Sequence, residues 1–184
     1  MKMPQLVCLL GAECTGKTTL AQQLADQCHS LWVDEYLRAF CVEKERTPTR
    51  AEQLHILQTQ ARHEDEALEQ ARQHQCAYVF CDTAPLLTAI YSDFCFSDRS
   101  LYARARRLHS RYALTLLLEP DIPWQADGLQ RDGAHVRGPV HALIARELAA
   151  LPGVTVHIAG TGTERLTCAQ RAVERALPIA ATQV

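Results

Sequence analysis

The phosphate-loop pattern G-x-x-x-x-G-K-[ST] fits residues 11–18 without a mismatch, and it restricts the fold of this chain more than any other feature. An apolar run at residues 5–10 comes directly before the loop, and a helical pattern with Leu20 and Leu24 on one face follows it. A phosphate loop needs both neighbours, because a buried strand feeds the turn and the N-terminus of a helix helps the backbone N–H groups to bind phosphate. The pattern therefore indicates a nucleotide site rather than a chance glycine turn.

The residue types within the loop suit a triphosphate and a metal ion. Gly11 and Gly16 allow a close approach that a Cβ atom would block, and Lys17 can reach the β- and γ-phosphates. Thr18 can offer its hydroxyl to Mg²⁺. Because the chain has no Asn-Lys-x-Asp guanine signature, we expect ATP as the donor and Mg²⁺ as its cofactor. The residues expected to contact the nucleotide are Gly11, Ala12, Glu13, Cys14, Thr15, Gly16, Lys17, Thr18 and Thr19.

Short apolar runs alternate with helical patterns along the rest of the chain. The runs are nearly continuous, which is typical of parallel strands that helices cover on both faces. We therefore predict one domain over residues 1–184 with a three-layer α/β fold, in which helices cover both faces of a five-stranded parallel sheet. Strands are expected at residues 5–10, 30–33, 76–81, 112–118 and 154–158. Helices are expected at residues 17–28, 50–73, 98–110, 140–151 and 163–177.

The composition fits a globular domain that acts on small molecules. Of the 184 residues, 47% are hydrophobic and 22% are charged. No apolar stretch approaches the roughly 20 residues of a membrane span, and the first residues do not form a signal peptide. The net charge is −2, from 19 basic and 21 acidic residues, so no overall positive field favours nucleic acid. We expect a cytoplasmic protein without membrane or nucleic-acid partners, and the oligomeric state is not predicted.

The eight cysteines are expected to be free thiols, because no C-x-x-C pair and no zinc-ligand spacing occurs. Cys14 differs from the others because it lies inside the phosphate loop, where a helix N-terminus can activate a thiol toward oxidation. The alternative, a small side chain at a permissive position, is favoured.

Asp82 comes directly after the apolar run at residues 76–81. A carboxylate at the end of a strand beside a phosphate loop can hold Mg²⁺ directly or through water. An aspartate shortly before Pro85 can instead cap a helix, and the two roles are compatible. The first role makes Asp82 a candidate catalytic and metal-binding residue.

Asp34 and Glu35 end the second apolar run, so both carboxylates should emerge at the ligand edge of the sheet. One of them can accept the proton of a substrate hydroxyl, and Glu35 is favoured with Asp34 close behind. The alternative is a capping pair for the helix that follows. Arg38, one turn further on, can contact phosphate or pair with these acids.

The long segment at residues 119–138 has no apolar periodicity and is rich in proline, glycine, aspartate and arginine. Loops of this length inside a domain are often functional lids. We predict a lid at about residues 120–138 that brings Arg131 and Arg137 to the transferring phosphoryl group. The alternative is a solvated loop whose arginines face water.

Four segments together resemble one family. Residues 11–20 resemble its loop Gly-Ala-Glu-Ser-x-Gly-Lys-[Ser/Thr]-Thr-Leu, and residues 35–38 are similar to its Glu-Tyr-x-Arg. Residues 80–83 with Thr88 look like its Asp-Thr-Asp…Thr strand end. Most specific are residues 120–131, which resemble its Pro-Asp-x-Pro-Trp…Asp-Gly-x-Arg segment. The family that these segments resemble is the ribosylnicotinamide kinase domain of the bacterial NAD-biosynthesis regulator, with its stand-alone relatives.

The resemblance implies a P-loop kinase fold similar to that of nucleoside-monophosphate kinases, with a closing lid. It also implies transfer of the ATP γ-phosphate to the 5′-hydroxyl of nicotinamide riboside, which gives nicotinamide mononucleotide for NAD biosynthesis. Trp124 and Tyr91 would stack on the nicotinamide ring, whose positive charge suits aromatic faces. The family's second aspartate is Ala84 here, and Tyr91 stands where a tryptophan is expected. The acceptor-site residues implied are Glu35, Tyr36, Arg38, Asp82, Tyr91, Trp124 and Asp127.

Two other functions stay open. A P-loop kinase for another nucleoside or small metabolite would share the phosphate-handling residues and differ in the pocket around Tyr36, Tyr91 and Trp124. An ATP-dependent switch or binding module without kinase activity would share the loop alone. Because only ten residues precede the loop, we expect neither a helix-turn-helix nor a nucleotidyltransferase domain in this sequence.

Overall fold

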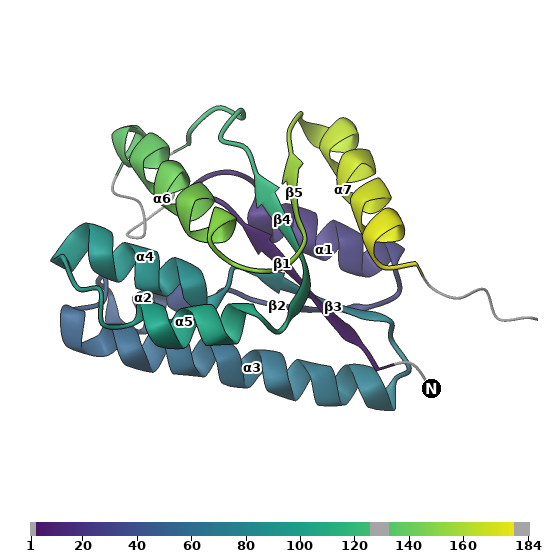
Figure 1. The fold of residues 1–184 in the computed structure, drawn as a ribbon, viewed down its shortest axis with the longest axis horizontal. Coiled ribbons are helices and arrows are strands. Elements are labelled where there is room, and N and C mark those ends of the chain that lie inside the picture. Colours follow the sequence, from purple (N-terminus) through teal and green to yellow (C-terminus); the bar gives the residue numbers. More distant parts are fainter. Residues whose placement is uncertain (1–2, 126–132, 179–184) are drawn as a thin grey trace, which may run out of the picture.

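The sheet has five parallel strands in the order β2-β3-β1-β4-β5 (Figure 1). β1 pairs with β3 on one side and with β4 on the other, so the strand that leads into the phosphate loop is central. The predicted parallel sheet is therefore confirmed, and the carboxyl ends of its strands meet at one edge, where ligands bind in such folds. In this computed structural model, which describes residues 3–125 and 133–178, the strands are β1 (Gln5–Leu10), β2 (Leu31–Val33), β3 (Tyr78–Asp82), β4 (Tyr112–Leu118) and β5 (Thr155–Ile158).

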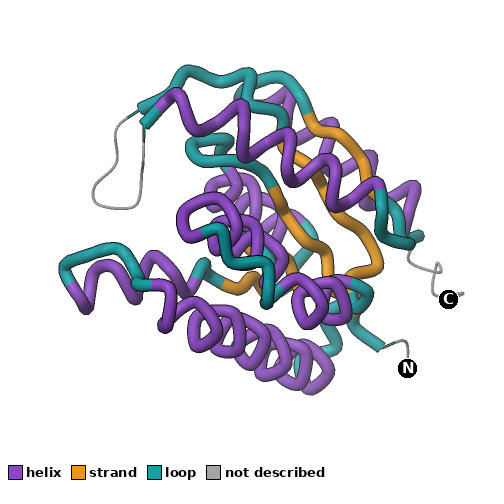
Figure 2. Tube along the Cα trace, turned by 60° about the vertical axis from the view of Figure 1, so that its left-hand side comes forward, coloured by secondary structure: helices purple, strands orange, loops and turns teal. Residues whose placement is uncertain are grey.

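Helices cover both faces of the sheet, which confirms the predicted three-layer arrangement (Figure 2). One face carries α1 and α7, and the other carries α3, α4, α5 and α6. Among the residues that the structure describes, no helix is long and apolar enough to cross a membrane. The helices are α1 (Lys17–Gln27), α2 (Tyr36–Lys44), α3 (Gln53–Gln73), α4 (Pro85–Phe96), α5 (Tyr102–His109), α6 (Arg137–Ala149) and α7 (Gly162–Ala176), with 3-10 turns η1 (Arg50–Glu52) and η3 (Ala134–Val136).

Alternate side chains of each central strand face opposite helix layers, which explains the continuous apolar runs in the sequence. In β1, Leu6, Cys8 and Leu10 pack into the core with α3 to α6. Val7 and Leu9 pack into the core with α1 and α7. Because both faces are buried, no polar side chain interrupts the strand.

Three helices differ from the expected ranges, and the other predicted ends are shifted by no more than three residues. The predicted ranges do not include α2 or α4, and a third helix begins later than expected. The helix expected from residue 98 begins at Tyr102, because Asp98 accepts hydrogen bonds from Ser100 N at 3.0 Å and from Arg50 Nε at 2.8 Å and so forms a turn. The helix α4 shows no amphipathic pattern, because much of it is buried. Its buried residues are Pro85, Leu86, Leu87, Ala89, Ile90 and Ser92.

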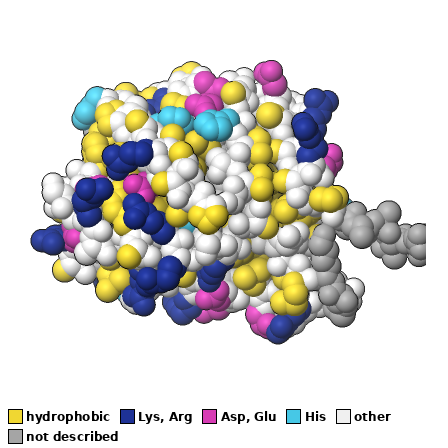
Figure 3. Space-filling view, in the orientation of Figure 1, with side chains coloured by type: hydrophobic (Ala, Val, Ile, Leu, Met, Phe, Trp, Pro, Cys, Tyr) yellow, Lys and Arg dark blue, Asp and Glu magenta, His cyan; other side chains and the backbone are white. Residues whose placement is uncertain are grey.

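Basic side chains gather over α4, α5 and α6 on the face shown in Figure 3. Some of this charge stabilises the packing of the helices. Arg106 on α5 donates to Glu147 on α6 at 2.7 Å, and its guanidinium lies 5.0 Å from the centre of the Tyr102 ring. The Arg106 side chain therefore belongs to the scaffold that supports the sheet.

Candidate functional site

The phosphate loop joins β1 to α1 at the carboxyl edge of the sheet. Gly16 is the N-cap of α1 with a φ of 80°, and a Cβ atom at Gly11 would lie 2.7 Å from Thr15 Oγ1. Glycine is therefore needed at residue 16 for its backbone conformation and at residue 11 for space, and the close approach of a phosphate at both positions stays a prediction. The Ala12 carbonyl accepts hydrogen bonds from Thr15 Oγ1 at 2.9 Å and from Lys17 Nζ at 3.1 Å. These bonds fix the start of the loop and hold the lysine beside it.

Thr18 and Asp82 meet beside the loop, where Thr18 Oγ1 donates a hydrogen bond to Asp82 Oδ2 at 2.5 Å. Asp82 is only 1% exposed, and its Oδ1 atom is buried without a hydrogen-bond partner among the described residues. Burial raises the pKa of the Asp82 carboxyl, and the positive charge of Lys17 opposes the rise. A buried carboxylate oxygen next to a hydroxyl is a donor set that fits Mg²⁺, which prefers oxygen ligands.

The protein offers Mg²⁺ only part of a coordination shell. Within residues 3–125 and 133–178, no group of three or more histidine, cysteine, aspartate or glutamate side chains could hold a metal ion. Mg²⁺ in nucleotide sites usually takes its remaining ligands from phosphates and water, so the pair at Thr18 and Asp82 is sufficient in number. The helix-cap alternative for Asp82 is wrong, because this residue ends β3 and the N-cap of α4 is Ala84.

A cleft with a volume of about 290 Å³ begins at the phosphate loop and extends between α2, α3 and α4. Its polar wall lies near the loop, and leucine, isoleucine, phenylalanine and cysteine side chains form much of the remainder. A concave site with a mainly apolar wall and a few placed polar groups is typical of small-molecule binding. The lining residues are Glu13, Cys14, Lys17, Glu35, Leu37, Arg38, Cys41, Thr47, Pro48, Gln53, Ile56, Gln60, Thr83, Leu87, Thr88, Tyr91, Cys95 and Phe96.

The two candidate bases are placed differently. Glu35 lines the cleft together with Lys17, whereas Asp34 is exposed and is not part of the cleft wall. Glu35 occupies the N-cap position of α2, but its side chain makes no capping hydrogen bond. Burial raises the pKa of the Glu35 carboxyl, and the nearby ammonium of Lys17 lowers it again in part, while Asp82 adds to the rise. The geometry therefore favours Glu35 over Asp34 as the group that faces a ligand.

Tyr91, Glu13 and Arg38 also line the cleft, as expected for ligand contacts. Tyr91 on α4 donates a hydrogen bond to Glu13 Oε1 at 3.5 Å, so an aromatic ring and a carboxylate lie side by side. Tyr36 lies elsewhere. Its ring packs against His55, with 5.8 Å between ring centres, and it is not part of the cleft wall. A contact between the Tyr36 side chain and a ligand stays a prediction.

The segment after β4 contacts the phosphate loop through Cys14. Gln125 N donates to Cys14 Sγ at 3.2 Å, and the thiol approaches the Pro123 carbonyl at 3.7 Å. Trp124 lies between these two residues and is half-buried, but it does not line the cleft. Its predicted stacking on a ligand would require the segment to approach α4, and it stays a prediction.

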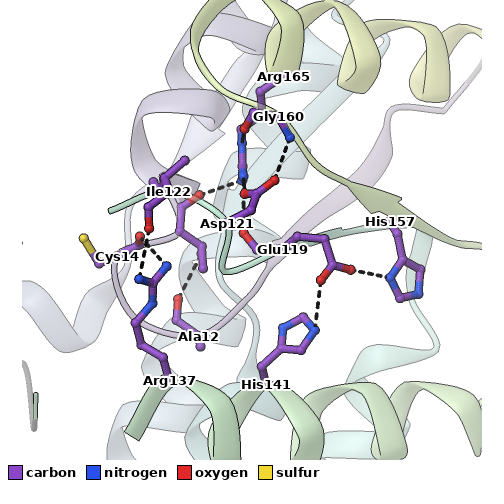
Figure 4. Close-up of polar contacts among 11 residues, drawn as sticks. Ala12, Cys14, Glu119, Asp121, Ile122, Arg137, His141, His157, Gly160 and Arg165 are labelled. Carbon is purple, nitrogen blue, oxygen red and sulfur yellow. Dashed lines mark hydrogen bonds and ion pairs between the residues drawn. The ribbon is translucent and has the colours of Figure 1, made fainter. Parts of the chain in front are cut away.

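Arg137 begins α6 and η3 precedes it, so a helix starts within residues 120–138, where the sequence predicted a loop, and the role of this segment as a lid stays a prediction. The guanidinium of Arg137 donates to the Ile122 carbonyl at 3.0 Å and to the Cys14 carbonyl at 3.4 Å (Figure 4). It therefore lies against the phosphate loop, as its predicted role requires, but here it binds backbone oxygens. Asp127 and Arg131 lie outside the described residues.

Sequence reasoning missed the contribution of α3 to the cleft. Gln53, Ile56 and Gln60 line it, and Gln60 Oε1 accepts a hydrogen bond from Tyr36 N at 2.9 Å. The spacing of three and four positions places these side chains on one helix face, which was a readable signal. Gln53 and Gln60 carry polar side chains of a kind that usually faces water, so neither was predicted to line a site.

Comparison with solved structures defines the class of protein first: the chain has the fold of P-loop kinases. It is similar to a NadR protein in complex with NR, with a TM-score of 0.82 and 20% identity over 99% of this chain. It spans about half the length of that protein, 53%. A deoxyadenosine kinase from M. mycoides has a TM-score of 0.63 and 10% identity, over 93% of this chain and all of the other. A thymidylate kinase from Ehrlichia chaffeensis has a TM-score of 0.65 and 14% identity, over 95% of this chain and 99% of the other.

The family follows from the sequence itself. Residues 6–165 match the family described as an AAA domain, and the chain belongs to that family. A search of curated protein sequences found no match. The predicted resemblance to the NadR kinase domain is confirmed in fold, since a second NadR structure, in complex with NAD and AMP-PNP, has a TM-score of 0.79 and 18% identity over 99% of this chain and 52% of that protein.

Proposed function

We propose that the protein transfers the γ-phosphate of ATP to the 5′-hydroxyl of nicotinamide riboside and so forms nicotinamide mononucleotide. The observation that carries the proposal is that Lys17 of the phosphate loop and the carboxyl group of Glu35 line one cleft of about 290 Å³. A phosphate-binding lysine and a proton acceptor within a cleft of this size suit phosphoryl transfer to a small alcohol. The choice of acceptor is supported by the four sequence segments and by the shared fold with the NadR protein in complex with NR.

On the donor side, the phosphate loop binds the β- and γ-phosphates through its backbone N–H groups. Lys17 exchanges the Ala12 carbonyl for phosphate oxygens when the nucleotide enters. Thr18 and Asp82 would hold Mg²⁺ with their oxygens, which the hydrogen bond between them already places together. The ion, when bound, neutralises charge on the phosphates.

On the acceptor side, Glu35 accepts the proton of the attacking hydroxyl. Burial raises the pKa of its carboxyl, which makes the carboxylate a stronger base than an exposed glutamate, while Lys17 favours the ionised form. Tyr91 and the neighbouring Glu13 carboxylate offer an aromatic face and a negative charge, and both attract a cationic nicotinamide ring. In the proposed closed form, Trp124 covers the other face of that ring.

The arginines of the lid segment complete the proposed site. Arg137 is placed beside the phosphate loop, and Arg131 belongs to the part of the lid segment that the structure does not describe. We propose that both stabilise the negative charge of the transferring phosphoryl group, the role that cationic groups play in such reactions. Arg137 would have to exchange a backbone carbonyl for a phosphate oxygen to do so.

A second acceptor class is another nucleoside, since the deoxyadenosine kinase shares the fold. The test is ADP release measured with nicotinamide riboside, other nucleosides and nucleoside monophosphates, with Lys17→Ala as the inactive control. Nicotinamide riboside should give the highest kcat/KM. If it gives no more ADP than buffer alone, the acceptor assignment is wrong, and the active member of the panel replaces it.

The proposed base has a matched control in the chain. Glu35→Gln should lower kcat by at least about 10²-fold with little change in ATP affinity, because only the proton acceptor is lost. Asp34→Asn changes the neighbouring exposed carboxylate and should leave kcat within about threefold of the wild type. A larger loss in Asp34→Asn than in Glu35→Gln would assign the role to Asp34.

A further inference from the structure

Arg165 is a buried arginine on α7 that no step of the proposed reaction uses; it is 5% exposed. Its guanidinium donates to three backbone carbonyls, at 2.6 Å to Gly160, at 2.9 Å to Thr15 and at 3.2 Å to Glu119. It also forms an ion pair with the Asp121 carboxylate (Figure 4). One side chain thus joins the phosphate loop, the segment after β4 and the turn between β5 and α7.

Asp121 fixes the position of this guanidinium. Its Oδ1 atom accepts a hydrogen bond from Arg165, and its Oδ2 atom accepts one from Gly160 N at 2.7 Å. A buried positive charge is tolerated only when it is paired, and here the partner is itself held at a second point. The direction in which Arg165 faces Thr15 is therefore set by the surrounding protein and not by the loop.

The bond to the Thr15 carbonyl has a consequence for the next N–H group. The peptide bonds of the described residues are trans, so the Thr15 carbonyl and the Gly16 N–H point in opposite directions. With the carbonyl turned toward Arg165, the Gly16 N–H points away from that side chain. Backbone N–H groups of a phosphate loop are the groups that bind phosphate.

This peptide would otherwise be easy to reorient. Gly16 has a φ of 80° and Cys14 a φ of 54°, so the peptide lies in a stretch with two left-handed residues. Glycine accepts several backbone conformations at little cost, and a flipped peptide would aim a carbonyl oxygen at the phosphates. The hydrogen bond from Arg165 opposes that flip.

We propose that Arg165, held by Asp121, is a positioning residue that keeps the Gly16 N–H directed at the phosphates of the nucleotide. Donors that are oriented before the ligand arrives need no reorganisation when it binds. The role depends on the proposed nucleotide site but not on the identity of the acceptor. It also predicts that Arg165 contributes to binding of the phosphates of the nucleotide and does not contribute to binding of its nucleoside part.

The test is calorimetric binding of AMP-PNP and of adenosine to the full chain, without an acceptor. Arg165→Gln should weaken AMP-PNP binding by about tenfold, and Arg165→Lys, which keeps the charge, by about threefold. Asp121→Asn, which places an amide N–H group against Arg165, should also weaken it by about threefold. Adenosine binding should stay unchanged in all three variants. Arg171→Gln is the matched control, since this arginine is exposed on the same helix, and it should bind both ligands like the wild type.

If Arg165→Gln does not fold, Asp121→Asn and Arg165→Lys test the proposal in its place. Folded variants that bind AMP-PNP as tightly as the wild type overturn the proposal, and so does an equal loss for adenosine and AMP-PNP. Failure of the wild type itself to bind AMP-PNP would overturn the nucleotide site and with it the proposed function. Binding of AMP-PNP without turnover of any acceptor would leave the role of Arg165 intact and contradict only the kinase proposal.

Discussion

Gly11→Ala should damage both stability and nucleotide binding, because the position has no room for one methyl group. The added Cβ would lie 2.7 Å from Thr15 Oγ1 and 3.0 Å from the Leu118 carbonyl oxygen, where an ordinary contact starts at 3.4 Å. The overlaps are thus about 0.7 and 0.4 Å. Thr15 cannot turn away without losing its 2.9 Å hydrogen bond to Ala12, and Leu118 O is fixed in the backbone of β4. Overpacking of this kind costs about 1–3 kcal/mol.

We expect the free energy of unfolding to fall by about 2 kcal/mol and AMP-PNP affinity to fall at least about tenfold, since the loop must shift. Urea unfolding and calorimetry measure the two quantities. Gly138→Ala is the matched control, because nothing lies within 4 Å of its Cβ position in α6. It should leave binding unchanged and change the free energy of unfolding less than Gly11→Ala does, because the usual gain from alanine in a helix is opposed by the ring of the next residue, Pro139. If Gly11→Ala changes the free energy of unfolding and the AMP-PNP affinity no more than Gly138→Ala does, the inference that the loop packs closely against β4 is wrong.

Three further changes test other parts of the account. Asp82→Asn should weaken Mn²⁺ binding to the AMP-PNP complex at least about tenfold, measured by electron paramagnetic resonance, and unchanged binding would exclude Asp82 from the metal site. Arg137→Ala should lower kcat more than it lowers AMP-PNP affinity, and equal losses would indicate simple phosphate binding. Burial raises the pKa of Glu64 to about 7, so ionisation destabilises the folded protein as the pH rises from about 4.3 to about 7. Glu64→Gln should therefore gain stability relative to the wild type across that window, by about 3 to 4 kcal/mol at roughly 1.4 kcal/mol per pKa unit, and a pH-independent difference in urea unfolding would contradict it.

The parts of the site that depend on local contacts were predictable from the sequence. The hydrogen bonds from Thr15 and Lys17 to Ala12 span three and five positions, so all three residues belong to the phosphate-loop motif. The sheet was predictable for the same reason, because burial on both faces leaves a continuous apolar run at each strand. The places of Asp82 and Glu35 followed from the rule that ligands bind at the carboxyl ends of parallel strands.

The parts that depend on distant contacts were not predictable. Arg165 lies 150 positions from Thr15, and an arginine in an amphipathic helix shows no sign in the sequence that it faces inward. The α3 wall of the cleft was missed because Gln53 and Gln60 are polar residues that usually face water. Arg137 was expected in a loop, and only the structure shows that it begins a helix against the phosphate loop.

The most direct test of the central claim follows the phosphoryl group itself. The protein is mixed with Mg²⁺, nicotinamide riboside and ATP labelled at the γ-phosphate, and the products are separated and identified by mass. The account predicts that the label appears in nicotinamide mononucleotide in equal amount to the ADP formed, and that Lys17→Ala forms neither. ADP without a labelled mononucleotide, or no reaction with nicotinamide riboside at enzyme concentrations that phosphorylate another alcohol, would contradict it.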